Sequence, residues 1–171
     1  MKKLLCVLIM FFGFNSLSFA GQGDHFLLPK IGFMVIDLHE TDPLISVGVL
    51  YGYGLSNRFS VEGELNYGFS GGEYTTEDNE TGEYRIWTAA GYGVFRLPIW
   101  DTGYLKAKVG GLYENVTRTS EQREDREDDD FGVAGGLGLG ALLWGKATLE
   151  LEATVIDKDI VFYSIGAHFS F

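Results

Sequence analysis

Cysteine and histidine are scarce in this sequence. Of its 171 residues only Cys6 is a cysteine, and it lies in an N-terminal segment that we expect to be removed. The mature chain is therefore predicted to have no disulfide and no cysteine-bound metal. The three histidines, His25, His39 and His168, do not have the spacing of a metal site or a catalytic pair. The sequence predicts neither a metal nor a cofactor.

Basic residues are also few, with 13 Lys and Arg against 24 Asp and Glu, for a net charge of −11. Nucleic-acid-binding proteins carry basic patches, so this balance argues against such a partner. A hydrophobic content of 46% argues against a disordered chain, and the length suits one domain. The chain is instead rich in glycine, with 24 residues, and in aromatic side chains, at 15%.

The first 20 residues have the pattern of a secretory signal. Lys2 and Lys3 precede an apolar core at residues 4–14, and Ser18-Phe19-Ala20 has the form of a cleavage site. We expect a cleaved signal peptide at residues 1–20 and one domain at residues 21–171. An N-terminal membrane anchor is the alternative, although the apolar core is short for a span of about 20 residues.

Long apolar runs are missing from the rest of the chain, so no membrane-spanning helix is predicted. Alternation of apolar and polar residues recurs instead, which is the pattern of a half-buried strand. It predicts eight strands, at 30–37, 44–55, 59–69, 84–97, 105–113, 131–144, 147–155 and 160–171. The inward phase of the strand from Tyr84 to Leu97 stays open, because Arg85 and Arg96 fall on opposite faces.

The predicted connections alternate between short and long. Ser56-Asn57-Arg58 and Gly145-Lys146 are short, whereas residues 71–83 and 117–130 would form long acidic loops. Short turns at one end and longer loops at the other are typical of an up-and-down barrel. All three prolines, Pro29, Pro43 and Pro98, are expected at strand ends or in connections, because proline cannot donate a ladder hydrogen bond.

Both soluble and membrane barrels alternate, so the direction of the apolar face must be inferred. Glycine on the polar faces would leave room for long side chains in a narrow interior. Aromatic residues form two bands on the apolar faces, as the girdles of a membrane barrel require. The expected bands are Phe59, Tyr104, Phe169 and Phe171 at the short-turn end, and Phe69, Tyr84, Tyr113, Phe131 and Tyr163 nearer the loops.

Three segments make the pattern more specific: residues 51–69, YGYGLSNRFSVEGELNYGF; residues 104–113, YLKAKVGGLY; and the ending YSIGAHFSF. They resemble the small bacterial outer-membrane β-barrel superfamily, which includes the OmpA-like and porin-like proteins. The resemblance implies an all-β, eight-stranded antiparallel transmembrane barrel, crossing the outer membrane of a Gram-negative bacterium many times as a monomer. It also implies contact with outer-membrane lipid and lipopolysaccharide, and with the barrel-assembly machinery. The terminal insertion signal would be Tyr163, Ile165, Phe169 and Phe171.

Six charged residues fall on the polar faces of three strands that begin at the short-turn end. They are Glu62, Glu64, Lys106, Lys108, Glu150 and Glu152. Because the six residues occupy equivalent positions along these strands, their side chains should lie at similar depth in the barrel. We therefore expect an ion-pair cluster that fills the lumen. The two lysines neutralise only two of the four carboxylates. Arg85, Arg96, Lys30 or His168 are candidates for the two remaining cations. The alternative is the solvated outer face of a soluble barrel.

The segment from Ser120 to Asp130 contains seven acids and two arginines. It would form a hydrated surface tip, or a weak site for Ca²⁺ or Mg²⁺, which prefer oxygen ligands. His168-Phe169-Ser170 resembles the His-x-Ser pair of lipid A deacylase barrels, but its expected place at the short-turn end argues against an enzyme. The predicted function is structural or surface interaction. A small channel for ions or hydrophobic solutes and adhesin-like binding to a host surface are the alternatives.

Overall fold

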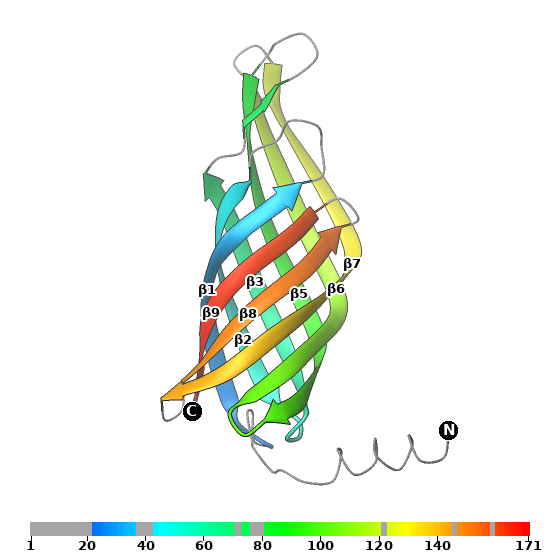
Figure 1. Cartoon of the computed structure of the whole chain (residues 1–171). Coiled ribbons are helices and arrows are strands. Elements are labelled where there is room, and N and C mark those ends of the chain that lie inside the picture. Colours follow the sequence, from blue (N-terminus) through cyan, green and yellow to red (C-terminus); the bar gives the residue numbers. More distant parts are fainter. Residues whose placement is uncertain are drawn as a thin grey trace, which may run out of the picture.

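The computed structural model describes residues 22–36, 43–70, 73–75, 81–120, 123–144, 147–157 and 160–171. The signal peptide predicted at residues 1–20 and His39 lie outside these ranges. The described chain consists of antiparallel strands (Figure 1). They are β1 (His25–Ile36), β2 (Leu44–Gly54), β3 (Phe59–Ser70), β4 (Glu73–Thr75), β5 (Thr81–Trp100), β6 (Gly103–Ser120), β7 (Arg123–Trp144), β8 (Ala147–Asp157) and β9 (Ile160–Ser170).

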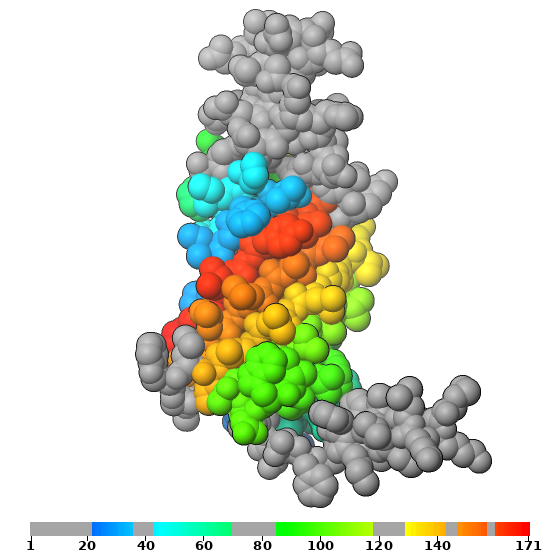
Figure 2. Space-filling view, in the orientation of Figure 1, coloured from blue at the N-terminus to red at the C-terminus, as the bar shows by residue number. Residues whose placement is uncertain are grey.

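Eight of the described strands close into a barrel. Each long strand pairs with its neighbours in the chain, β1 pairs with β9, and β3 pairs with β5 because the short β4 pairs only with β5. The space-filling view shows β1, β9, β8 and β7 as one unbroken wall (Figure 2). The predicted eight-stranded up-and-down barrel is confirmed. Nowhere in the described chain is there a helix of the length and apolarity needed to cross a membrane.

Two segments predicted as long loops contain strands. β6 and β7 continue their pairing to Arg118 and Arg126, so most of residues 117–130 is a hairpin rather than a loop. Within residues 71–83, β4 pairs with the first residues of β5. Apolar-polar alternation stops at these positions, so the sequence pattern does not predict strands there. Backbone pairing continues because it does not depend on apolar side chains. As a result β5, β6 and β7 extend well beyond the other strands at one end of the barrel (Figure 1).

The expected placement of prolines is wrong for Pro29 and Pro98, which lie inside β1 and β5. The pairing of β1 with β9 runs to Leu27 and resumes at Lys30. Pro29, which has no N–H to donate, therefore lies at a gap in the ladder. Pro98 adjoins an irregularity in the pairing of β5 with β6. Pro29 thus lies at a gap in the ladder and Pro98 beside a register irregularity near the end of its strand, which are positions that tolerate proline.

Apolar side chains cover the outside of the barrel and charged ones lie within. Val61 is 46% exposed and Leu151 51%, whereas Glu62 and Glu150 are 3% and 2% exposed. Outward aromatic pairs lie near both ends: Phe59 with Phe95 at the short-turn end, and Trp87 with Tyr113 and Phe131 toward the extended strands. Tyr104 is an exception to the predicted bands, because it is fully buried in the lumen.

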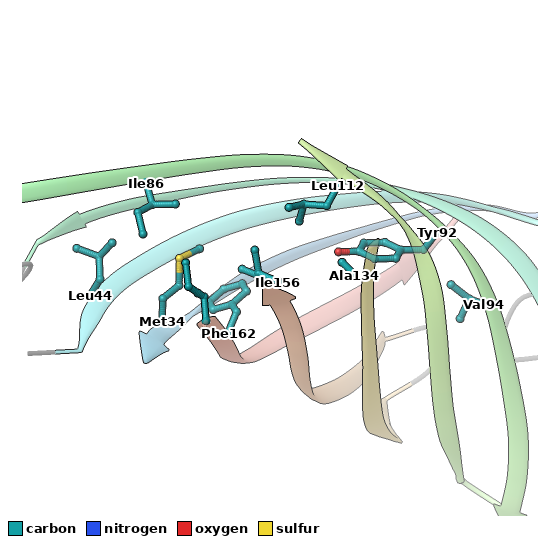
Figure 3. Packing of buried hydrophobic residues seen from close by; sticks show 10 residues of the cluster. Met34, Leu44, Ile86, Tyr92, Val94, Leu112, Ala134, Ile156 and Phe162 are labelled. Carbon is teal, nitrogen blue, oxygen red and sulfur yellow. The ribbon is translucent and has the colours of Figure 1, made fainter. Parts of the chain in front are cut away.

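The lumen is not polar throughout. Toward the extended end it contains an apolar cluster that includes Met34, Leu44, Ile86 and Phe162, with Tyr92 and Val94 on the side opposite Leu44 (Figure 3). A smaller cluster of Phe26, Leu28 and Leu50 lies toward the short-turn end. Several of these residues come from segments in which both strand faces are apolar, so alternation alone did not assign them to the inside. The charged side chains therefore share the lumen with two apolar clusters.

Candidate functional site: a luminal charge cluster

The six predicted charged residues come together in the lumen. Glu62 and Glu64 project from β3, Lys106 and Lys108 from β6, and Glu150 and Glu152 from β8, since alternate residues of a strand share one face. Every one of them is less than 10% exposed. Because β3, β6 and β8 are not neighbours in the barrel, their ion pairs run across the interior rather than along the wall.

Nearer the short-turn end, Lys106 is the central cation. Its Nζ lies 2.7 Å from Glu150 Oε1 and 2.9 Å from Glu62 Oε2. Glu62 also binds the guanidinium of Arg96, which in turn donates to Ser60 Oγ at 2.6 Å. The Tyr104 hydroxyl donates to Glu150 Oε2 at 2.6 Å. Each carboxylate here has more than one donor.

One step toward the extended end, Glu152 is the central anion. Its carboxylate lies 2.6 Å from Lys108 Nζ, 2.8 Å from Lys106 Nζ and 3.3 Å from Lys30 Nζ. Lys30 and Lys108 also bind Glu64, at 2.7 and 2.8 Å. Lys106 and Glu152 thus join the two levels into one network.

The balancing cations are Lys30 and Arg96, two of the four candidates. The third candidate, Arg85, is exposed on the outer side, which settles the phase of its strand, with Arg96 facing inward. His168 is buried, packs against the Phe26 ring and lies 3.4 Å from Ser170 Oγ. We define the luminal charge cluster as four carboxylates and four cations: Glu62, Glu64, Glu150, Glu152, Lys30, Arg96, Lys106 and Lys108.

Inward glycines provide the space that these side chains occupy. A Cβ atom on Gly136 would lie 3.0 Å from Lys108 Cε, and one on Gly48 would lie 3.1 Å from Lys30 Cε. The same is true of aromatic rings, because a Cβ on Gly140 would overlap Tyr104. A barrel of eight strands has little interior volume. Long charged side chains therefore fit inside it because glycine lies opposite them.

Aromatic rings connect the charge cluster to the apolar clusters. Lys108 Nζ lies 4.1 Å from the centre of the Tyr92 ring, and Lys30 Nζ lies 4.9 Å from that of Phe162. At the other side Arg96 lies over Phe26 and Tyr104. Such cation–π contacts favour a desolvated cation. Sequence reasoning missed these ring contacts: it placed Tyr104 in an outer aromatic band and assigned no role to the other three rings.

The remaining predicted residues lie elsewhere. Tyr163, Ile165, Phe169 and Phe171 of the expected insertion signal are exposed on the outside of the barrel or at its end. Of the acidic segment from Ser120 to Asp130, the described side chains are Asp129, which accepts from Asn115 Nδ2 at 2.6 Å, and Asp130, which accepts from the Phe131 N–H at 2.8 Å. The described side chains form no group of three or more potential metal ligands.

Comparison with known proteins gives the family. Residues 12–171 match the family described as outer membrane protein beta-barrel domain. The chain belongs to this family. Membership places the protein in the bacterial outer membrane, so the apolar outer wall faces lipid. A sequence comparison with curated proteins finds no match.

Solved structures with the same fold are distant in sequence. Neisserial surface protein A has 9% identity and a TM-score of 0.65, with 88% of this chain and 98% of that one aligned. OprG of Pseudomonas aeruginosa has 13% identity and a TM-score of 0.64, covering 88% and 97%. The attachment invasion locus protein Ail of Yersinia pestis, in complex with the heparin analogue sucrose octasulfate, has 15% identity and a TM-score of 0.59, covering 88% and 99%. At these identities the likeness concerns the fold alone.

The aromatic rows agree in spacing with a membrane. Phe59 and Phe69 mark the two ends of the outward face of β3, a distance of about 33 Å along a strand at 3.3 Å per residue. With a tilt of about 40° this becomes roughly 25 Å of height, the size of the apolar band in such barrels. The parts of β5, β6 and β7 beyond the row of Trp87, Tyr113 and Phe131 therefore lie outside the band.

Proposed function

We propose that the protein is a closed outer-membrane barrel that does not conduct, and that it anchors an exposed sheet with a role in surface interaction. The observation that carries the first part is the position of Glu152, which binds Lys30, Lys106 and Lys108 from β1 and β6. These contacts span the lumen. A solute would have to separate ion pairs that have left water, and breaking a buried pair costs about 3–5 kcal/mol.

The second part of the proposal is supported by the length of three strands. β5, β6 and β7 continue past the aromatic row that marks the membrane boundary. A rigid sheet above the membrane is a suitable element for contact with the exterior. We further propose that the protein is a monomer without enzymatic activity, that its partners include lipopolysaccharide and the barrel-assembly machinery, and that the latter reads the terminal aromatic residues.

Conductance in planar bilayers tests the closed lumen. We expect the wild-type protein to be silent at modest voltage. Lys106→Glu with Lys108→Glu places six acids against two cations in the luminal charge cluster, so repulsion should open stepwise conductance or prevent folding. Arg85→Glu, on the outside, is the charge control and should stay silent.

Heat-modifiable gel mobility separates opening from misfolding in these variants. Steady openings of the wild-type protein would instead support the small channel for ions or hydrophobic solutes. Silent, stable Lys106 and Lys108 variants would contradict the sealing role of the luminal charge cluster.

A further inference from the structure

The extended sheet ends in the short strand β4 on one side and in the long strand β7 on the other. On the β5 side, β4 pairs with Thr81, Gly82 and Glu83. On the β7 side, pairing with β8 begins only at Gly135, whereas pairing with β6 continues to Arg123. In the part of the chain that the structure describes, no strand pairs with the outer side of β7 at residues 123–134. We call the part of this stretch that reaches from the membrane boundary outward, residues 123–131, the open edge.

The backbone groups of the open edge can be assigned from the ladder. Leu142 N donates to Thr102 O, so even-numbered residues of β7 direct their N–H groups toward β6. The register with β6 is unbroken from Ala141 to Arg126, so the alternation holds along this stretch. Residues 127, 129, 131 and 133 therefore direct their N–H and C=O groups away from the sheet. The Phe131 N–H agrees with this, because it donates to the Asp130 side chain.

Side-chain exposure agrees with a missing neighbour strand. Phe131 is 80% exposed and Val133 79%, more than any other large apolar residue described. Tyr113 covers Phe131 from the β6 side. An added strand would cover Phe131 on its other flank while pairing with the outward backbone groups, and it would replace the Asp130 carboxylate at the Phe131 N–H.

The charge of the open edge selects the partner. Residues 123–130 contain six acids and two arginines, a net charge of −4. Across the ladder, residues 127–130 pair with Thr117, Val116, Asn115 and Glu114, none of which is cationic. Like charges side by side in a ladder are unfavourable. A second copy adding at this edge would place acids beside acids, whereas an extended segment rich in lysine or arginine would complement them.

We propose that the open edge of β7 binds an extended cationic segment of another protein by strand addition. The inference rests on the proposed surface role, because the edge must be reachable from outside the cell. Backbone pairing provides the docking geometry, and alternate lysine or arginine side chains provide selectivity for the acidic strand. The added strand would continue the sheet formed by β5, β6 and β7.

Binding of a labelled peptide to the full-length protein in lipid nanodiscs tests this. The probe is a short peptide of alternating lysine and valine, and its control is the same peptide N-methylated at every peptide bond, which retains charge but cannot donate. We expect the control to bind about tenfold more weakly or worse. In the protein, Phe131→Pro removes the outward N–H at the membrane boundary and no acid, and should weaken binding of the unmodified peptide to a similar degree.

Two charge variants complete the test. Asp128→Lys with Asp129→Lys should weaken binding about tenfold or more. Glu77→Lys with Asp78→Lys changes the net charge equally at residues outside the open edge, and should leave binding within about twofold. Equal binding of the N-methylated peptide, or equal loss in both charge variants, would reduce the interaction to general electrostatic attraction and overturn strand addition. Heat-modifiable mobility verifies that each variant is folded.

A separate measurement distinguishes this inference from the proposed function. Asp129→Cys introduces a thiol into a mature chain expected to have no other, and a membrane-impermeant maleimide should label it on intact cells. If the thiol is labelled but the lysine-valine peptide does not bind, strand addition is wrong and the exposed sheet stands. If the thiol is not labelled on intact cells but reacts after lysis, the surface role itself is wrong.

Discussion

The ring of Tyr104 on β6 lies against Gly140, its partner on β7, at a place where any Cβ atom would overlap the ring. From there the Tyr104 hydroxyl reaches Glu150 on β8 and donates to it at 2.6 Å. A glycine on one strand thus lets an aromatic side chain cross it and bind a carboxylate on the next. The charge cluster depends on this packing as well as on its ion pairs.

Gly140→Ala should therefore destabilise the barrel. The added methyl group must displace the Tyr104 ring, and overpacking of this kind costs about 1–3 kcal/mol of unfolding free energy. Gly111→Ala is the matched control, because Gly111 is exposed on the outer side and nothing lies within 4 Å of its added Cβ. Urea unfolding in lipid vesicles measures both variants. Equal stability of the two would show that the ring moves at no cost.

The two balancing cations allow a second test. Lys30→Met leaves Glu64 and Glu152 with fewer cations in a buried site, so we expect a loss of about 3–5 kcal/mol. Arg85→Met removes the same charge from the exposed outer side of β5 and should change stability by about 0.5 kcal/mol or less. The same unfolding measurement compares them. If Lys30→Met is as stable as Arg85→Met, the buried ion pairs do not hold the barrel closed.

Strand count and order could be predicted from the sequence, because alternation reports which residues share a face. The direction of the apolar face followed instead from glycine on the polar faces and from the two aromatic bands. β8 is the clearest case, with Glu150 and Glu152 inside and Leu151 outside. The extension of β6 and β7 could not be predicted, because both faces of that hairpin are polar and alternation disappears. Backbone pairing continues there without any periodic signal in the side chains.

The site was predictable in part for a similar reason. Six of its eight charges lie on strands with sharp alternation, whereas Lys30 lies on β1, where most inward residues are apolar. Arg96 could not be separated from Arg85 until the pairing of β5 with β3 fixed which parity faces the lumen. Tyr104 was assigned to the outside because an aromatic residue near a strand end suits a girdle. Its inward position depends on Gly140, a contact between strands that no single segment reveals.

The orientation of the wall gives the third test, which uses two positions on the same outward face of β6. Val109 is 62% exposed and lies midway between the two aromatic rows, so Val109→Arg would place a charge in the middle of the apolar band. The expected cost is about 2–4 kcal/mol. Thr117 lies on the same strand beyond Tyr113, outside the band, so Thr117→Arg should cost about 0–1 kcal/mol. Reversible folding into vesicles, followed by tryptophan fluorescence, measures the difference. Equal costs at Val109 and Thr117 would mean that both face water or both face lipid, and the membrane boundary drawn through Trp87, Tyr113 and Phe131 would be misplaced.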